Sequence, residues 1–151
     1  MAVTKSYNGF PPKYREKQGY AVYKMFKTGE LARPIECVGC GALAADGAPI
    51  MAHNEDYHNP LNFVGICFGC HMAVHYRFRD IPTWEKWCDY TANGWQPPYS
   101  RDYKVFLSAW DRIKFAPKES PQRFTWLHGL PHVEPNLYTP ESEWANGELN
   151  F

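Results

Sequence analysis

Apolar residues recur at helical spacing early in the chain, between Tyr14 and Thr28. The stripe consists of Ala21, Val22, Met25 and Phe26. Prolines precede this segment and Gly29 follows it, which suits a helix that begins just after the prolines and ends at the glycine. We therefore predict a helix here, with its stripe packed in a core and most of its lysines outside the stripe.

Two further helices are predicted after residue 80. Thr83 is expected to cap a short helix that contains Trp84 and Trp87, and Asn93-Gly94 is expected to end it. The next helix should run from about Ser100 to Phe115. Its apolar face is predicted to hold Tyr103, Phe106, Leu107 and Trp110.

Repeated prolines forbid long regular structure from residue 116 onward. We interpret 116–151 as an extended arm whose aromatic side chains pin it either to its own domain or to a protein partner. These aromatics are Phe124, Trp126, Tyr138, Trp144 and Phe151. Cores and interfaces both use such side chains, so the pattern leaves the two alternatives open.

Composition and length place this 151-residue chain, which is 44% hydrophobic, among small folded proteins. We expect one compact α+β unit in four segments: a lead-in and basic helix (1–33), a Cys/His-rich module (34–80), a helical extension (81–115) and the arm (116–151). No apolar run approaches the roughly 18 residues of a membrane helix, and the start lacks a secretion signal. We therefore predict a cytoplasmic protein that does not enter a membrane.

The net charge is zero, but the charge is unevenly distributed. Residues 1–33 carry seven Lys/Arg against two acids, whereas residues 116–151 carry five glutamates against two basic residues. The basic start is suited to phosphate, and DNA is a candidate partner. An ordinary solvated surface with uneven charge remains the alternative.

Four cysteines form two Cys-x-x-Cys pairs in the pattern C-x2-C-x26-C-x2-C. They are Cys37, Cys40, Cys67 and Cys70. In a reducing compartment such pairs are typical of metal ligands, because two thiolates in each turn converge on one tetrahedral ion. Glycine occupies the same place in both turns, where a tight turn must curl around the metal. We predict one structural Zn²⁺ and interpret Cys88 as a core thiol.

Histidines form a second candidate cluster next to the cysteines. His71 and His75 are four residues apart in an expected helix and therefore share a face, whereas His71 diverges from its neighbour Cys70 by about 100°. A hairpin between the cysteine pairs would bring His53 to the same face. Three histidines with open positions are typical of a catalytic metal site, so we predict a possible second divalent ion, Mg²⁺, Mn²⁺ or Ni²⁺.

The run from Gly29-Glu30-Leu31 through C-V-G-C-G, A-H-N-E-D-Y, N-P-L-N-F-V-G-I-C-F-G-C-H and M-A-V-H resembles the HNH, or ββα-metal, nuclease superfamily. It is most similar to small four-cysteine members from bacteriophages, and the resemblance covers about residues 14–78. It implies a ββα-metal zinc module flanked by helices, with the host cytoplasm as the location if a phage encodes the protein.

The resemblance also implies roles for individual residues. His53, His71 and His75 match the ligands of the catalytic ion, and Asn62 matches an asparagine that steadies the hairpin and orients the general base. Asn54 stands where the family has the base, a second histidine. A carboxamide cannot accept a proton from water as imidazole does. His58, or His53 in a shifted register, could substitute for the base.

Two functions follow from these residues and from the resemblance. The first is an HNH-like metal-dependent DNA endonuclease with an impaired general base, in which Asn54, Asn62 and His53 contribute to catalysis. The second is a catalytically silent zinc-stabilised scaffold that binds a host protein, a viral protein or nucleic acid. The aromatic arm favours a protein partner, while the basic N-terminal helix favours nucleic acid.

Overall fold

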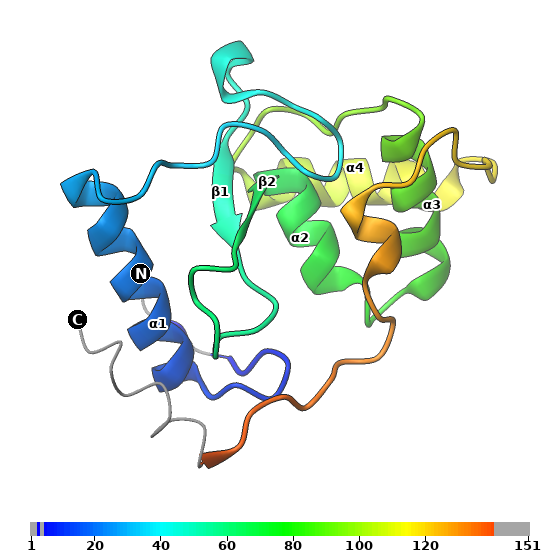
Figure 1. Cartoon of the computed structure of the whole chain (residues 1–151). Coiled ribbons are helices and arrows are strands. Elements are labelled where there is room, and N and C mark those ends of the chain that lie inside the picture. Colours follow the sequence, from blue (N-terminus) through cyan, green and yellow to red (C-terminus); the bar gives the residue numbers. More distant parts are fainter. Residues whose placement is uncertain (1–2, 4, 141–151) are drawn as a thin grey trace. The chain divides into compact units, whose positions relative to one another are not determined.

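Within residues 3 and 5–140, which the computed structural model describes, four α-helices accompany one two-stranded sheet (Figure 1). The order is α1 (Pro12–Thr28), η1 (Ala44–Asp46), β1 (Ile50–His53), β2 (Val64–Cys67), α2 (Phe68–Tyr76), α3 (Ile81–Ala92), α4 (Tyr103–Phe115) and η2 (Trp126–Gly129), where η marks a 3-10 turn. The fold is therefore small and α+β, as predicted. Among the described residues, none of the helices combines the length and apolar character that a bilayer crossing requires.

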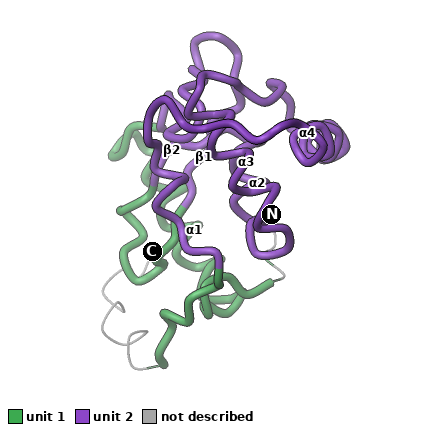
Figure 2. The backbone as a smooth tube through the Cα atoms, turned by 90° about the vertical axis from the view of Figure 1, so that its right-hand side faces the viewer, with its two compact units in different colours: residues 1–33, 54–63, 133–151 green, residues 34–53, 64–132 purple. Residues whose placement is uncertain are grey.

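The chain forms two compact units rather than the single one expected from its length (Figure 2). Unit 1 comprises residues 1–33, 54–63 and 133–151, and unit 2 comprises residues 34–53 and 64–132. Each unit is assembled from segments distant in sequence. This arrangement could not be read from the local pattern.

Unit 1 is built on α1 and an aromatic core. The helix begins at Pro12, where the missing N–H costs no hydrogen bond, and ends at Gly29, whose φ of 82° is the left-handed conformation that glycine tolerates. Phe10, which is fully buried, packs on Tyr14, with ring centroids 5.8 Å apart. The Leu137 amide donates to the Asn8 carbonyl at 2.9 Å, which ties residues 133–140 into this unit.

Unit 2 places a β-hairpin directly before a helix. Strands β1 and β2 pair antiparallel, with Ile50 opposite Cys67 and His53 opposite Val64. The chain passes from β2 into α2 without an intervening loop, because Cys67 is extended and Phe68 is already helical. The order β1, β2, α2 is thus the ββα arrangement that the family resemblance implied.

Helices α3 and α4 contact each other and α2 in the core of unit 2. The expectation that Thr83 caps α3 is wrong, since Asp80 is the cap and accepts from the Thr83 amide at 3.2 Å. The predicted face of α4 is partly rotated: Phe106 and Trp110 are buried, but Tyr103 is 41% exposed. The face of α4 that packs in the core is therefore formed by Phe106, Ala109, Trp110 and Ile113.

The arm belongs partly to each unit. Leu127 and Leu130 are buried in the core of unit 2, so this part of the arm is pinned to its own domain. Tyr138 packs in unit 1 against Phe10, with ring centroids 6.2 Å apart. Trp144 and Phe151, which were also expected to anchor the arm, lie outside the described residues.

Candidate metal centres

The first cysteine pair, Cys37 and Cys40, lies in a tight turn that precedes β1 in the sequence. The Gly41 amide donates to the Cys37 carbonyl and the Cys37 amide donates to the Ala42 carbonyl, both at 2.9 Å. Gly41 has a φ of 77°, a conformation that residues with a Cβ rarely adopt. The Val38 amide donates to the Gly65 carbonyl of β2 at 2.9 Å. The turn is thereby fixed to the strand that leads to the second pair.

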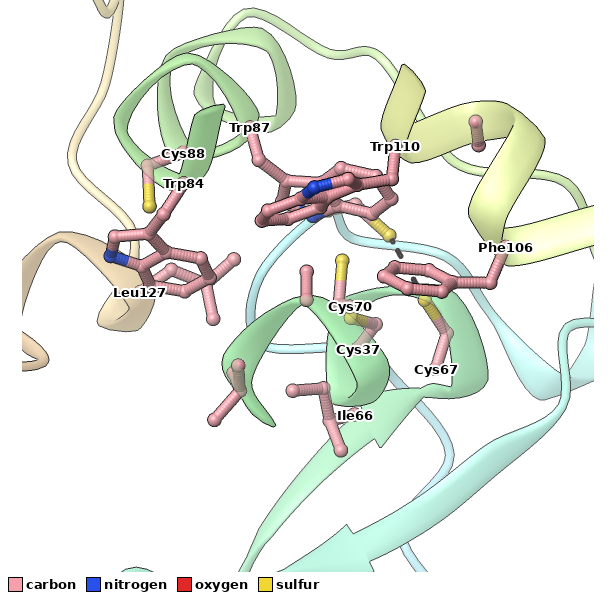
Figure 3. Close-up of a cluster of buried hydrophobic side chains, with 14 of the residues drawn as sticks. Cys37, Ile66, Cys67, Cys70, Trp84, Trp87, Cys88, Phe106, Trp110 and Leu127 are labelled. Atoms are coloured by element: carbon pink, nitrogen blue, oxygen red, sulfur yellow. Dashed lines mark hydrogen bonds between the residues drawn. The ribbon is translucent and has the colours of Figure 1, made fainter. Parts of the chain in front are cut away.

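The second pair lies at the junction of β2 and α2. Cys67 is the last residue of the strand and the N-cap of the helix, and Cys70 follows in its first turn. Figure 3 shows the sulfurs of Cys37, Cys67 and Cys70 below the rings of Trp87 and Trp110 and beside the ring of Phe106. All four cysteines are buried, and one metal-ligating atom from each lies within 4.8 Å of the others. The structure therefore brings the two predicted pairs together.

The spacing of the sulfurs fits a zinc tetrahedron. Zn–S bonds of about 2.3 Å give sulfur–sulfur edges of about 3.8 Å. The Sγ atoms of Cys40 and Cys67 are 3.7 Å apart, the contact that is dashed in Figure 3. A disulfide requires about 2.05 Å, and all five cysteines are free. Donor set, burial and spacing together are those of a structural zinc site.

The thiols perturb one another strongly. Hydrogen bonding from the Cys40 side chain, and then from Cys67 and Cys70, lowers the pKa of Cys37 far below its ordinary value. Burial is the main cause that raises the pKa of Cys70, with Cys37 adding to it. Burial and mutual hydrogen bonding thus move the pKa values of Cys37 and Cys70 in opposite directions, whereas a divalent cation would stabilise the thiolate form of its ligands.

Glycines let neighbouring side chains close over the cysteines. A Cβ on Gly39 would lie 2.6 Å from Cδ1 of Leu127, and one on Gly69 would lie 2.7 Å from the Pro97 ring. Leu127, in η2, is fully buried. The matched glycines are thus needed for close approach by Leu127 and Pro97, while Gly41 is the one whose backbone requires glycine.

Three histidines form the second cluster of unit 2. His53 ends β1, and His71 and His75 lie one turn apart on α2. The Nε2 atoms of His71 and His75 are 3.1 Å apart, and the ring centroid of His53 lies 5.0 Å and 5.5 Å from theirs. One ring nitrogen from each histidine lies within 4.8 Å of the others. His53 is buried, whereas His71 and His75 are partly exposed.

The two asparagines of the candidate site lie in unit 1, in the loop 54–63 that joins β1 to β2. Asn54 Oδ1 accepts from the Asp56 amide at 3.0 Å, and Nδ2 donates to the Asn59 carbonyl at 3.2 Å. The Asn54 carboxamide therefore shapes this loop. The Asn62 side chain is exposed, and its backbone amide donates to the Asn59 carbonyl at 2.9 Å.

The suggested substitutes for the general base are not supported. His58 packs in unit 1, with Nδ1 at 3.2 Å from the Tyr14 hydroxyl and Nε2 at 2.9 Å from the Leu137 carbonyl. Both ring nitrogens are thereby engaged. His53 lies with His71 and His75, which agrees with the unshifted register.

One aromatic residue at the histidine cluster was not identified as a site residue from sequence. The ring centroid of Trp126, in η2, lies 5.9 Å from that of His53. His128 holds this turn in place, since its Nδ1 accepts from the Thr125 amide at 3.3 Å and its Nε2 lies 3.3 Å from Asp89 on α3. Only the aromatic character of the arm hinted at such a contact.

Comparisons with known proteins identify no relative. No protein-family model, curated protein or solved structure matches the chain. The two clusters must therefore be interpreted from their own geometry and chemistry.

Proposed function

We propose that this chain is a metal-dependent phosphodiesterase of the HNH, or ββα-metal, type that acts on DNA. In this proposal the cysteine cluster holds a structural Zn²⁺, while His53, His71 and His75 hold a second divalent ion. The observation that carries it is the convergence of three imidazoles from β1 and α2 within one ββα element. Three nitrogen ligands leave coordination positions open, which is typical of catalytic rather than structural metal sites.

In this proposal the three histidines bind the ion and Trp126 positions one of them. A bound divalent ion supplies charge stabilisation at the scissile phosphate and a more acidic water. The partly exposed imidazoles of His71 and His75 on α2 and the buried imidazole of His53 on β1 would hold this ion. The Trp126 ring, in contact with His53, limits how that imidazole can turn. This contact would hold His53 in position for an ion.

A second candidate function, a catalytically silent zinc-stabilised scaffold, rests on a specific observation. Both polar atoms of the Asn54 carboxamide are engaged in hydrogen bonds within the 54–59 loop. This residue thus does structural work where the proposed family has its general base. A scaffold would bind a protein or nucleic acid, and Phe124 of the arm, which is 84% exposed, is a suitable contact residue for a protein.

Cleavage of plasmid DNA separates the two functions. The purified protein is incubated with supercoiled plasmid and Mg²⁺, Mn²⁺ or Ni²⁺, beside His71→Ala and a matched control, His132→Ala. His132 is a partly exposed histidine of unit 2 outside the cluster. Nicking that His71→Ala abolishes and His132→Ala retains supports the phosphodiesterase. No nicking with any ion, despite one zinc per chain, supports the scaffold.

The Asn54→His substitution tests whether a general base is the only catalytic group that the site lacks. A general base contributes about 10²–10⁴ in rate, so we expect nicking to increase by a factor in that range. Asn54→Ala is the control for loss of the loop hydrogen bonds. An increase in both variants would attribute the gain to the altered loop, whereas an inert Asn54→His that still binds the second ion would count against the assigned base position.

A further inference from the structure

A hollow of about 790 Å³ opens along α1 within unit 1, on the side of the helix opposite its buried residues Tyr14, Gln18, Ala21 and Val22. Its lining includes three basic residues, Lys13, Arg15 and Lys17, and three tyrosines, Tyr20, Tyr23 and Tyr57. Of the nine lining residues only Glu16 is acidic. Cationic and aromatic side chains thus alternate in one concave surface, and neither of the metal clusters is part of it.

Two of the tyrosines present their rings to solvent. Tyr20 is 56% exposed and Tyr23 is 49% exposed, and their rings lie nearly parallel, with centroids 6.5 Å apart and an interplanar angle of 26°. The Lys24 ammonium lies 5.8 Å from the Tyr20 ring centroid. Proteins bind single-stranded nucleic acid with exposed aromatic rings beside cations, because the bases stack on the rings while the cations pair with the phosphates of the nucleic-acid backbone.

Arg15 is held in place at the hollow. Its guanidinium lies 5.5 Å from the Tyr7 ring centroid and 5.4 Å from the Tyr57 ring centroid, and Nη1 donates to the Lys5 carbonyl. The Nε atom is buried and has no hydrogen-bond partner among the described residues. A guanidinium fixed in this way beside the hollow is suited to a phosphate oxygen.

We propose that this hollow binds a segment of single-stranded DNA, with bases stacked on Tyr20 and Tyr23 and phosphates paired with Lys13, Arg15 and Lys17. The choice of DNA rests on the proposed function, whereas the preference for a single strand rests on the tyrosines. A duplex keeps the faces of its bases stacked on one another, so it cannot use the exposed rings. The charge of the lining complements a polyanion.

The stacking part is tested by fluorescence anisotropy with a labelled 15-nucleotide oligo(dT) and no added divalent ion. Stacking is worth enough that each of Tyr20→Ala and Tyr23→Ala should weaken binding about tenfold. Phe115→Ala, which removes an 82% exposed ring from α4, is the matched control and should bind like the wild type. Equal affinity of all three variants would overturn the proposal.

The electrostatic part is tested through salt dependence. Each phosphate contact adds about 0.7 to the slope of log Kd against log salt for single strands, so Lys13→Gln/Lys17→Gln should lower the slope by about 1.4. Lys104→Gln/Lys114→Gln, with the same charge change on exposed positions of α4, should leave it unchanged. Equal slopes in the two double variants would contradict a phosphate contact in the hollow.

Gly19→Leu separates binding from folding. A Cβ on Gly19 would meet nothing within 4 Å, and Gly19 lines the hollow within a helix. Leucine should therefore raise the melting temperature through its higher helix propensity and still weaken oligonucleotide binding by occupying the space. Weaker binding with a lower melting temperature would attribute the loss to misfolding and count against the hollow.

Two further measurements identify the ligand and separate this proposal from the proposed function. Tighter binding of a hairpin duplex, or of oligo(rU), would overturn the choice of single-stranded DNA. His71→Ala should bind the oligonucleotide like the wild type, because His71 belongs to unit 2 and no ion is added. Absence of nicking alone would therefore leave the hollow intact, whereas loss of oligonucleotide binding in the tyrosine variants with nicking preserved would support it.

Discussion

The cysteine and histidine clusters of unit 2 both draw on α2, but their surroundings differ. The cysteine cluster has four sulfur donors, all buried, and Leu127 and Pro97 close over its glycines. The histidine cluster has three nitrogen donors, two of them partly exposed. Cys70 and His71 are adjacent, yet the helix directs them about 100° apart and so into different clusters. A closed, complete ligand set stabilises a fold, whereas an open one leaves room for a reactant.

The largest expected effect is the loss of the closed site. Cys67→Ala, or removal of zinc by a chelator, should unfold unit 2, because structural zinc binding supplies on the order of 10 kcal/mol in small zinc domains. Circular dichroism on heating, together with zinc analysis, measures this. Cys88→Ala removes a buried thiol outside the cluster and should cost only about 1–2 kcal/mol. Equal destabilisation by both substitutions would contradict a zinc centre.

The second prediction concerns how tightly the cysteine site is closed. Gly39→Ala should destabilise the protein by about 1–3 kcal/mol, because the new methyl overlaps Leu127. Leu127→Ala should cost about 2–5 kcal/mol through the cavity that it leaves. The double variant should be more stable than the sum of the two losses, since each change relieves the other. Strict additivity in denaturant unfolding would argue against this contact.

The third prediction concerns the open site. His71→Ala should change the unfolding free energy by less than about 1 kcal/mol, because His71 is only partly buried, yet it should abolish binding of the second ion. Titration with Ni²⁺ should partly and saturably quench tryptophan fluorescence, because Trp126 contacts His53. Trp126→Phe should lose this quenching and retain binding by calorimetry. Quenching that persists in His71→Ala would point to another ion site.

The last prediction concerns Cys88, a buried thiol outside both clusters. Burial, and then the charges of Asp89 and Glu85, raise the pKa of Cys88 above its ordinary value of about 9. The unfolded thiol ionises more readily than the folded one, so stability is complete below pH 9 and declines as the pH rises above it. The decline should be about 1.4 kcal/mol per pH unit.

The difference in unfolding free energy between wild type and Cys88→Ala, measured from pH 8 to 10.5, isolates this decline, because other ionisations cancel. A difference that does not vary with pH would mean that Cys88 is accessible to water in the folded state. Burial of the Cys88 thiol would then not explain the direction of its pKa shift, and Cys88 could no longer serve as the buried, metal-free reference for the four-cysteine cluster.

Local sequence pattern identified much of unit 2. The paired Cys-x-x-Cys spacing predicted that four thiols would meet, and the i, i+4 spacing predicted that His71 and His75 would share a face; both are what the structure shows. The end of α1 at Gly29 was likewise predictable. Local rules failed at the start of α3, where Asp80 rather than Thr83 is the cap, because both are polar residues suited to that position.

Contacts between distant segments escaped prediction. Leu127 closes on Gly39 across 88 positions of the sequence, and Trp126 reaches His53 from the same turn. Asn54 and Asn62 were grouped with the histidines by resemblance, but the structure shows Asn54 engaged within the loop 54–59 of unit 1. A one-dimensional pattern contains no signal for such packing.

The sequence by itself determined which side chains can ligate a metal and that the first cysteine pair lies in a tight turn, because ligand chemistry and turn residues are local properties. Only the tertiary structure decided which side chains cover each cluster, and that the chain divides into two compact units. The physical reason is that burial depends on side chains far away in sequence. Their close approach is selected by packing of the whole core.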